Sequence, residues 1–597
     1  MHDKVSSVSQ LPEWYPAWAR EVEEQYRAGD ACFFVLHGNV HDLVACESGT
    51  NARFCSVNNF LSEYMFGRWE NVLQHNLSTG LQPLAGRDSD RHRTMMQDLT
   101  GVFGAFRNWS RKPDDVLANL DQLIERYLIE DNADKRKRLA VIFDFGQYLV
   151  PPGDPVQVSG TIASRVVRFL DWARNPYVRR VNMAFFLICE SLSEVNDRLT
   201  QSPFVATVEI PMPDLRSRQS FVKSKLSGGP DAGTDAAGDT DSADDRLTVS
   251  QLVSNSNGLS LLSLEQLLVQ SSGTLRPTAG EFRELKKTAI ERQCGGFLEF
   301  VAPKHTLDLV VGHEAATQRL RDDAVLISNG HADAAPMGYL ICGPVGTGKT
   351  FLAECYAGSI GIPCVKLQNF RSKYVGESEA NLQRVLTVLR SLGPVVVIID
   401  EADAALGDRN QGGDSGTSGR VFSMIAQQMG DTRYRGRIIW MLLTCRPDLL
   451  PIDLKRQGRA EVHIPLFYPE DETEIRDMFR IMARKNGISV QSDELTVGER
   501  FRELSGADIE SVVLSGRRFA LLEKRTTVTT NDINRALNEF IPSAQGMEKD
   551  MQEIAAVLEC TQTDFLTGKW KEILESDDGR ASLQQQLSRI RNLVERM

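Results

Sequence analysis

The sequence lacks the features that mark several large classes of protein. Its longest apolar runs, such as 395–399 and 184–189, are far shorter than the ~20 residues that span a bilayer. The first ten residues contain no apolar stretch, so we expect no secretory signal, no membrane contact and a cytoplasmic location. The ten cysteines are scattered without a CxxC pair, which favours reduced buried thiols over disulfides or a metal site.

The chain also has fewer basic residues than acidic ones. The chain has 68 Lys and Arg against 80 Asp and Glu, a net charge of −12. Such a surface gives no broad attraction to nucleic acid or to an anionic membrane, although a local basic channel remains compatible with it. The chain also has no zinc-finger spacing, so nucleic acid is not an expected partner.

What is present is the composition of a soluble globular protein, with 42% hydrophobic and 25% charged residues. At 597 residues the chain is too long for one ordinary core and predicts three to five domains. Short apolar segments alternate with helical ones, at 33–36, 140–143 and 184–188 and again at 339–342, 395–399 and 438–443. This alternation predicts parallel α/β sheets in both halves.

One segment between the halves has a different composition. Residues 228–245 are rich in glycine and contain six Asp and no basic residue. Because so few apolar side chains cannot offset the entropy of folding, we expect a flexible acidic insertion. The apolar spacing of 261–268 then indicates a helix, so the insertion fits a loop inside a small helical subdomain.

The strongest motif begins directly after the predicted strand 339–342. Residues 343–350 read G-P-V-G-T-G-K-T and match G-x-x-x-x-G-K-[ST] in a strand–loop–helix context. The glycines let backbone N–H groups surround phosphate oxygens, while Lys349 supplies positive charge and the Thr350 hydroxyl can bind Mg²⁺. The helix that follows presents its N-terminus to the same anion.

A second motif lies at the end of the strand 395–399. Two carboxylates, Asp400 and Glu401, follow this apolar run. Asp400 can hold Mg²⁺ through water, and Glu401 can polarise a water molecule for attack on the terminal phosphate. Two adjacent acids at the end of a buried strand are costly unless a cation or hydrogen bonds receive them.

With these motifs in order, the segment from about residue 300 to 543 resembles the AAA family of P-loop ATPases within the AAA+ superfamily. The two motifs correspond to its Walker A and Walker B motifs, and 307–313 to the segment that contacts adenine. The resemblance implies ATP and Mg²⁺ as cofactors, with Thr350 and Asp400 as metal ligands. The residues that it implies at the nucleotide are Gly343, Pro344, Val345, Gly346, Thr347, Gly348, Lys349, Thr350 and Phe351, with Gly312 and Ala507.

The resemblance also implies a substrate channel. Lys373, Tyr374 and Val375 lie where the family has its first pore loop, whose aromatic residue grips an extended polypeptide. Tyr374 is otherwise an ordinary half-buried aromatic residue. Residues 408–419 correspond to the second pore loop, and a plain surface loop is an equal alternative.

Three further segments follow the family pattern. Thr444 and Cys445 lie at the sensor-1 position. Cys445 replaces the usual Asn and is a much weaker hydrogen-bond donor, which puts the rate of ATP hydrolysis in question. The Thr444 hydroxyl could compensate for the missing amide. Arg456 and Arg459 match the arginine fingers, which stabilise the transferring phosphoryl group in a neighbouring subunit. Residues 505–509 resemble the helical lid, and Thr529 with Asp532 forms a helix-capping pair.

The first half repeats the plan without its chemistry. The strand 139–143 is followed by Asp144, but Phe145 stands where Glu401 does, and no Walker A motif precedes Gly343. We therefore predict a degenerate AAA-like domain that stabilises a ring or docks a partner.

The predicted fold is a P-loop NTPase parallel sheet with a C-terminal helical lid, preceded by the degenerate α/β domain. The expected ranges are 1–290 for the first domain, including the insertion at 228–245, 300–468 for the ATPase α/β domain, 469–543 for the lid and 544–597 for a helical tail. Apolar residues at 583, 587, 590 and 594 indicate that the tail packs on the lid, with a short coiled coil or a partner helix as the alternative.

The expected function is a chaperone-like ATPase, a hexameric homo-oligomer that moves a protein substrate through its pore. The alternatives are a nucleotide-dependent assembly scaffold with slow hydrolysis and, less favoured, a nucleic-acid motor. A fused metalloprotease is disfavoured because the one His-Glu pair, His313-Glu314, lacks the second histidine of H-E-x-x-H, residue 317 being Thr.

Overall fold

The computed structural model divides into two compact units, Met1–Cys294 with Ser372–Ser391, and Gly295–Arg371 with Leu392–Met597. The residues that the structure describes are 12, 14–46, 53–106, 109–130, 136–153, 160–226, 247–270, 277–303, 305–329, 331–368, 377–406, 415–469, 471–490, 504–541, 546–576 and 578–594. The predicted insertion at 228–245, the pore-loop residues Lys373, Tyr374 and Val375, and most of 408–419 lie outside these ranges.

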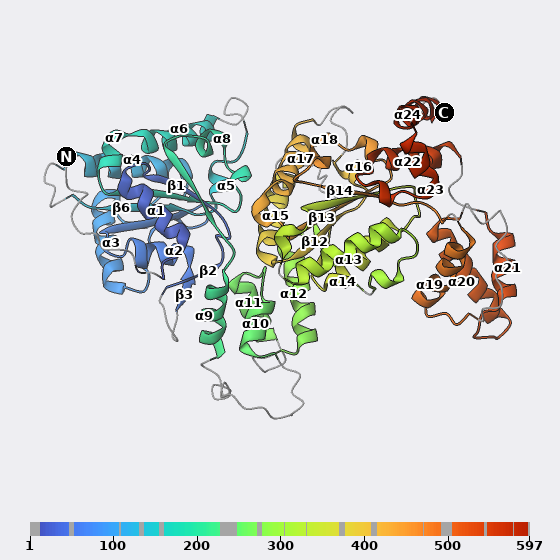
Figure 1. Ribbon diagram of the computed structural model, residues 1–597. Helices are drawn as coiled ribbons and strands as arrows, with labels where there is room; N and C mark the ends of the chain where they lie inside the picture. Colours follow the sequence, from blue (N-terminus) through green and yellow to red (C-terminus); the bar gives the residue numbers. More distant parts are fainter. Residues whose placement is uncertain are drawn as a thin grey trace. The chain divides into compact units, whose positions relative to one another are not determined.

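The first unit, most of which is drawn in blue to green in Figure 1, is built on a six-stranded sheet in the order β5-β4-β6-β7-β1-β8. Only the edge strand β5 is antiparallel to its neighbour. The strands are β1 (Phe33–Gly38), β4 (Asn71–Asn76), β5 (Gly80–Pro83), β6 (Leu139–Phe143), β7 (Met183–Ile188) and β8 (Val205–Ile210). A small hairpin, β2 (Leu43–Ala45) and β3 (Phe54–Ser56), follows β1.

Side chains that alternate along these strands fill two cores, one on each face of the sheet. Phe33 stacks on Phe185 on one face, and Phe34 stacks on Phe186 on the other. The first face is covered by α4 (Pro113–Ile129), α6 (Gly160–Arg174), α7 (Pro176–Arg180) and α8 (Asp197–Thr200). The second face is covered by α1 (Ala17–Ala28), α2 (Val57–Phe60) and the π-helical turn Leu61–Met65, while α3 (Ser89–Phe103) contributes to both cores.

A helical subdomain follows β8. Its helices are α9 (Leu215–Leu226), α10 (Val249–Asn255), α11 (Leu261–Gln270) and α12 (Ala279–Gln293), and α15 (Glu377–Leu392) is grouped with the same unit almost to its end. Thr248 and Thr278 begin α10 and α12 with reciprocal capping boxes, which satisfy the first backbone N–H groups of each helix.

The second unit has a sheet of the same plan, in the order β14-β10-β13-β12-β11-β9, with β9 as the antiparallel edge. Its strands are β9 (Leu298–Val301), β10 (Gly338–Cys342), β11 (Cys364–Leu367), β12 (Val395–Ile399), β13 (Ile438–Thr444) and β14 (Val462–Pro465). Helices α13 (Glu314–Ser328) and α14 (Lys349–Ile360) pack on one face, where Tyr339, Ile341 and Ile398 contribute to the core. The predicted α/β class is confirmed.

The rest of the second unit is helical. Short helices α16 (Ala402–Leu406) and α18 (Ile452–Lys455) and the longer α17 (Ser415–Met429) connect the strands, and α19 (Glu472–Lys485), α20 (Gly506–Leu522) and α21 (Thr530–Glu539) form a lid with its own core. Ser505 with Asp508 and Thr529 with Asp532 form the capping boxes of α20 and α21. None of the helices in the described ranges combines the length and apolar character needed to cross a membrane.

The tail contains α22 (Met547–Glu559), α23 (Gly568–Glu575) and α24 (Gly579–Val594). Leu583, Leu587 and Ile590 pack with residues of α22 and α23 and with Phe467, which follows β14. The expected packing of the tail on the lid was therefore wrong. Apolar spacing shows that a helix has a buried face, but it does not say which surface covers that face.

Candidate active site

The loop between β10 and α14 has the backbone that the 343–350 motif predicts. Gly343, Gly346 and Gly348 have φ values of 143°, 84° and 88°, in the region that favours glycine. A Cβ on Gly343 would lie 2.2 Å from the Leu466 carbonyl oxygen, and one on Gly346 would lie 2.6 Å from Ser505 Oγ. The glycines therefore permit both the curvature of the loop and its close approach to β14 and the lid.

Polar side chains meet beneath this loop. Lys349 Nζ donates to the Gly343 and Pro344 carbonyl oxygens at 2.9 and 2.8 Å. Thr350 Oγ1 lies 3.3 Å from Asp400 Oδ2, and Lys366 Nζ on β11 forms an ion pair with the same Asp400 oxygen at 2.7 Å. Lys366 was not among the predicted site residues. The one signal for it was a lysine inside an otherwise apolar strand.

Glu401 is placed by an uncommon backbone conformation. Its φ of 48° lies in the left-handed region, and its N–H donates to Asp400 Oδ1 at 3.0 Å. The Glu401 carbonyl oxygen accepts the N–H groups of Ala404 and Ala405 and so begins α16. This turn leaves the Glu401 side chain exposed at the carboxyl end of β12. An exposed carboxylate at such an edge, on a residue with a strained backbone, suits a catalytic base.

A cavity of about 320 Å³ opens beside the loop. Its walls come from the loop and α14, from the segment before α13, and from the lid helices α19 and α20. The lining residues are Leu309, Val310, Val311, His313, Gly346, Thr347, Gly348, Lys349, Thr350, Phe351, Leu352, Leu466, Met478, Ile481, Met482, Lys485, Gly506, Ala507 and Glu510. The mostly apolar wall opposite the loop suits a planar ring, and the loop end suits an anion.

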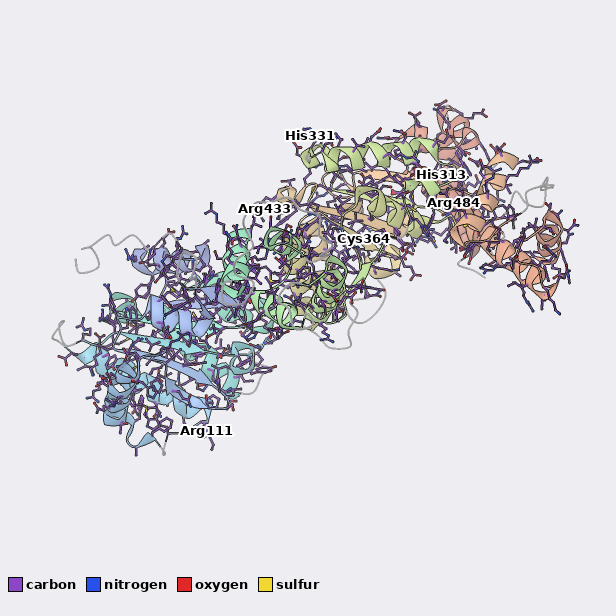
Figure 2. All side chains as sticks on the ribbon, turned by 90° about the horizontal axis from the view of Figure 1, so that it is seen from below. Arg111, His313, His331, Cys364, Arg433 and Arg484 are labelled. Carbon is purple, nitrogen blue, oxygen red and sulfur yellow. The ribbon has the colours of Figure 1, made fainter. Side chains whose placement is uncertain are left out.

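Two residues implied outside the loop lie in different places. Ala507 lines the cavity, and its N–H donates to the Gly346 carbonyl oxygen at 3.4 Å. Gly312 lines an adjacent cavity together with Phe467 and Glu474. His313, labelled in Figure 2, contacts the backbone of Phe467 through Nε2, and burial lowers its pKa to about 4.

The sensor-1 position has its own polar contacts. The Thr444 hydroxyl donates to Asp403 Oδ1 at 2.7 Å and accepts the Arg446 N–H at 2.8 Å. Thr444 is buried, with 1% of its surface exposed. Its proton is thus bound within the chain, so in this conformation Thr444 does not replace the donor that Cys445 lacks.

The two predicted arginine fingers differ in their contacts. Arg459 Nη1 donates to the Asp453 carbonyl oxygen at 2.5 Å, and burial, followed by the nearby charge of Arg456, lowers the pKa of Arg459. Arg456 is exposed just after α18. Among the described lining residues of the 320 Å³ cavity there is neither Arg456 nor Arg459.

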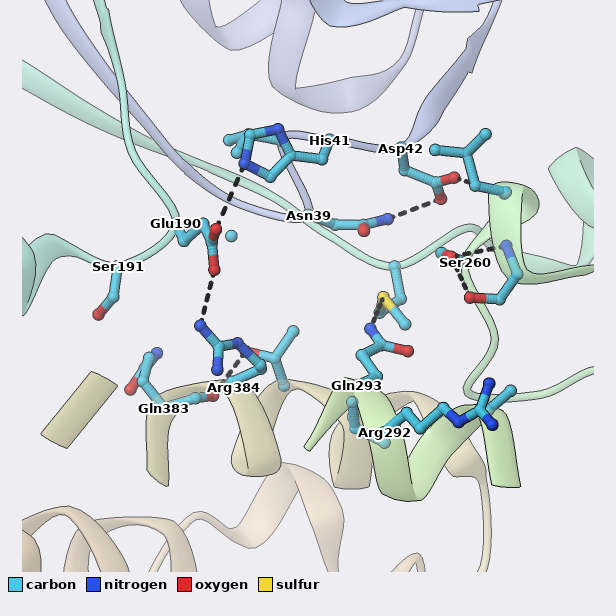
Figure 3. Close-up of a pocket in the computed structure, with 18 of the residues that line it drawn as sticks. Asn39, His41, Asp42, Glu190, Ser191, Ser260, Arg292, Gln293, Gln383 and Arg384 are labelled. Atoms are coloured by element: carbon cyan, nitrogen blue, oxygen red, sulfur yellow. Dashed lines mark hydrogen bonds and ion pairs between the residues drawn. The ribbon is translucent and has the colours of Figure 1, made fainter. Parts of the chain in front are cut away.

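The corresponding edge of the first sheet carries different residues. The loop after β1 runs through Asn39, His41 and Asp42, and the Asp42 carboxylate accepts the N–H groups of Leu261 and Leu262 at the start of α11, both at 2.9 Å. Asn39 Nδ2 donates to the same carboxylate at 2.8 Å (Figure 3). Asp42 thus supplies a fixed negative charge at a helix N-terminus.

A cavity of about 670 Å³ lies at this edge of the first unit. Among the residues that line it, Figure 3 shows Glu190 between His41 and Arg384. Glu190 contacts His41 Nε2 at 3.4 Å and Arg384 Nη2 at 2.6 Å. The contact with His41, and then the charge of Arg384, lower the pKa of Glu190 to about 2, although burial opposes this shift. The contact with Glu190 in turn raises the pKa of His41, again against the effect of burial.

Family models match both units. Residues 339–468 match the family of ATPases associated with various cellular activities, AAA, and residues 10–211 match the N-terminal Rossmann-like domain of AAA+ chaperones. The chain belongs to the AAA+ family. Its second unit carries the AAA domain, and its first unit is the AAA-like α/β domain without a Walker A motif, in agreement with the shared strand order.

Curated relatives of this AAA+ chain match part of its length. It is 27% identical over 226 residues to a 26S proteasome regulatory subunit 8 homolog of Encephalitozoon cuniculi, covering 37% of this chain and 57% of the relative. It is 30% identical to the ATP-dependent zinc metalloprotease FtsH of Mesoplasma florum, covering 35% and 32%, and 30% identical to the ribosome biogenesis ATPase RIX7 of Saccharomyces cerevisiae, covering 36% and 27%. The chain thus spans between about a quarter and just over half of the length of these relatives.

Proposed function

We propose that this AAA+ protein binds ATP in the 320 Å³ cavity and hydrolyses it in an oligomer of identical subunits, to remodel protein substrates. The observation that carries the proposal is the division of the catalytic groups. Lys349 and Thr350 line the cavity and Thr350 contacts Asp400, the residue before Glu401, while Arg456 is exposed outside the cavity lining. A finger placed this way serves a neighbouring copy, which makes oligomer formation part of the reaction.

The residues present fit ATP with a divalent cation. The glycine backbone of 343–348 and the Lys349 ammonium suit the phosphates, and the Thr350 hydroxyl with the Asp400 carboxylate offers the oxygen ligands that Mg²⁺ prefers. Bound there, Mg²⁺ would neutralise charge on the phosphates. In this proposal Glu401 orients and deprotonates the attacking water, and Arg456 or Arg459 of the neighbouring copy stabilises the charge of the transferring group.

A protein substrate fits the charge and the relatives better than a nucleic acid does. The net charge of −12 disfavours a polyanionic substrate. Two of the relatives are, by name, a proteasome regulatory subunit and an ATP-dependent metalloprotease, and the first unit matches a domain of AAA+ chaperones. The chain has no H-E-x-x-H motif, so the proposal takes from these relatives the handling of proteins and not their cleavage. Tyr374 is the proposed substrate contact, and a hexamer is the proposed assembly.

A second candidate is a nucleotide-dependent assembly scaffold with slow turnover. The specific observation for it is the sensor-1 position, where Cys445 is a weak donor and the Thr444 hydroxyl is bonded to Asp403. The remodelling ATPase and the scaffold differ in whether hydrolysis drives substrate release.

The experiment is a substrate trap. Full-length Glu401→Gln protein with ATP and Mg²⁺ should form a stable oligomer and retain bound protein that the unaltered chain releases, because binding persists while hydrolysis stops. Captured proteins are identified by mass spectrometry, with Lys349→Ala/Glu401→Gln as the matched control that cannot load nucleotide. Turnover by Glu401→Gln equal to that of the unaltered chain would remove Glu401 from the mechanism. Capture by the control as well would show binding unrelated to ATP.

A further inference from the structure

Helix α22 of the tail contacts the 343–350 loop and also the segment 455–459, which contains Arg456 and Arg459. Near its middle, Gln552 Oε1 accepts the N–H of Val345 at 3.1 Å, inside the 343–350 loop. At its end, the Glu559 carboxylate forms an ion pair with Lys455 at 2.9 Å, and Lys455 directly precedes Arg456. Positions 552 and 559 are seven residues apart, or about two helical turns, so both side chains leave the same side of α22.

The contact with the loop is reinforced on its other side. Val345 donates its N–H to Gln552, and its carbonyl oxygen accepts from the Tyr468 hydroxyl at 2.8 Å. Lys549, in the first turn of α22, lies with its ammonium 4.5 Å from the centre of the Tyr468 ring. Helix α22 thus holds Val345 directly through Gln552 and indirectly through Tyr468.

The contact of α22 with the segment that contains Arg456 also has several parts. Lys455 Nζ donates to the Pro447 carbonyl oxygen at 2.9 Å as well as pairing with Glu559, so it joins the segment after Cys445 to α22. His463 of β14 contacts the Glu559 carbonyl oxygen through Nδ1 at 2.9 Å. Lys455 is only 13% exposed at its side chain, and a partly buried ion pair is screened less by solvent than a surface pair.

Between its two ends α22 is packed firmly. Met551, Ile554, Ala555, Ala556 and Val557 are buried, and Ile554 and Val557 share a core with Phe467 and Trp570. A helix fixed along its length moves as a rigid body, since its backbone hydrogen bonds are internal. Val345 and Lys455 are therefore joined through one rigid element.

We infer that Gln552 and Glu559 are positioning residues, and that α22 couples the nucleotide loop of a subunit to the arginine finger that the subunit offers to its neighbour. The inference rests on the proposed function, because it takes Arg456 to act across subunits. It assigns the tail a role in the reaction cycle. Nucleotide binding moves the loop, α22 follows, and the segment that carries Arg456 is displaced with it.

The test is a double-mutant cycle on the full chain, with a conservative control. Gln552→Met removes the acceptor at similar volume. Lys455→Met removes the ion pair, whereas Lys455→Arg keeps the charge. The turnover number at saturating ATP, the KM for ATP and the affinity for a fluorescent ATP analogue are measured for each single variant and for Gln552→Met/Lys455→Met.

We expect Gln552→Met to weaken analogue binding about fivefold, the size of one lost hydrogen bond. We expect Lys455→Met to lower turnover severalfold at unchanged analogue affinity, with turnover restored in Lys455→Arg. Gln552→Met should also lower turnover at saturating ATP, and the double variant should turn over no more slowly than the worse single variant.

Three results overturn the inference. One is a double variant whose loss of turnover is the product of the two single losses, since independent sites add in free energy. Another is full turnover of Gln552→Met at saturating ATP. The third is unchanged analogue binding in Gln552→Met, which can be measured even if the unaltered chain hydrolyses no ATP. Absent turnover of the unaltered chain contradicts the proposed function instead, so the two failures are distinct.

Discussion

The turns after β6 and β12, one in each sheet, have the same backbone conformation but different side chains around them. Asp144 and Asp400 both follow the third parallel strand along the chain, and each accepts the N–H of the next residue, at 3.2 and 3.0 Å. That next residue is left-handed in both, with a φ of 55° at Phe145 and 48° at Glu401. The two turns therefore share one backbone conformation, although the residue after the aspartate is a phenylalanine in one unit and a glutamate in the other.

The neighbours of the two aspartates differ in charge. Asp144 Oδ2 accepts from two neutral amides, Asn58 and Gln74, both at 3.2 Å. Asp400 Oδ2 meets the Thr350 hydroxyl and the Lys366 ammonium. Gln74 and Lys366 hold the same register, since Gln74 pairs with Ile142 and Lys366 with Ile398, two residues before each aspartate. A single difference at this position, glutamine in one sheet and lysine in the other, gives Asp144 an amide partner and Asp400 a cationic one.

The loops after the first strands differ more. In the second unit the start of α20 contacts the loop at Gly346, and Lys349 supplies the cation. In the first unit the start of α11 is capped by the Asp42 carboxylate. An anion already present at the helix N-terminus repels phosphate and uses the N–H groups that phosphate would accept from. The comparison teaches that the fold provides the edge and that a few side chains decide what binds there.

The largest expected effect is on nucleotide binding. Lys349→Ala should weaken ATP binding about 100-fold, because it removes the charged donor to the phosphates. Isothermal titration should give one site per unaltered chain and no measurable site in the variant. Asn39→Ala, at the first edge, is the matched control and should bind as the unaltered chain does. A site that survives Lys349→Ala at full stoichiometry would show that the first edge binds nucleotide.

The next effect concerns acid stability of the first unit. Burial, and secondarily the charge of Arg165, lowers the pKa of His75 to about 4. Because the folded-state pKa lies below the unfolded value of about 6.5, stability is complete above pH 6.5 and is lost as the pH falls toward 4. Between pH 7 and pH 5 the loss should be about 2 kcal/mol.

Urea denaturation at the two pH values measures this loss. His75→Leu copies Leu367, which follows Lys366 as His75 follows Gln74, and should remove that part of the pH dependence. His92→Leu, an exposed position on α3, is the control and should leave the slope unchanged. A slope in His75→Leu equal to that of the unaltered chain would contradict the assignment to His75.

A smaller effect is expected at the sensor-1 position. Cys445→Asn should raise ATP turnover about tenfold, since an amide is a better donor than a thiol and a hydrogen bond to a charged group contributes about 1.5 kcal/mol or more. Turnover at saturating ATP is the measurement, and Cys445→Ala is the control, which should show no gain. Equal turnover in all three proteins would mean that the donor comes from another residue.

The smallest effect is expected on Mg²⁺ affinity, when Lys366, the ion-pair partner of Asp400, is replaced. Lys366→Gln gives Asp400 the amide that Asp144 has, and removes a cation that competes with Mg²⁺ for the carboxylate. The Mg²⁺ concentration for half-maximal binding of an ATP analogue should fall about threefold, the weak end expected for a solvent-screened ion pair. Lys366→Arg should keep the original midpoint. A midpoint that rises in Lys366→Gln would show that Lys366 assists the metal.

Much of the first unit followed from pattern alone. The apolar segments at 33–36, 140–143 and 184–188 lie within β1, β6 and β7, and Asp144-Phe145 was recognised as the counterpart of Asp400-Glu401. The role of Asp42 was not foreseen, because its partners Leu261 and Leu262 are about 220 residues away. A single aspartate in a loop carries no local signal of a contact at that separation.

The sequence by itself determined the features whose physics is local. A glycine-rich turn before a lysine cradles phosphate whatever surrounds it, and two acids at the end of a buried strand need a cation or hydrogen bonds. The alternating apolar segments likewise determined the α/β class. The tertiary structure decided which groups meet. Lys366 reaches Asp400 because β11 and β12 pair in register, and Gln552 reaches Val345 because the tail returns to the sheet instead of the lid. Such contacts depend on how strands and helices pack, and packing between distant segments leaves no period or motif in the chain.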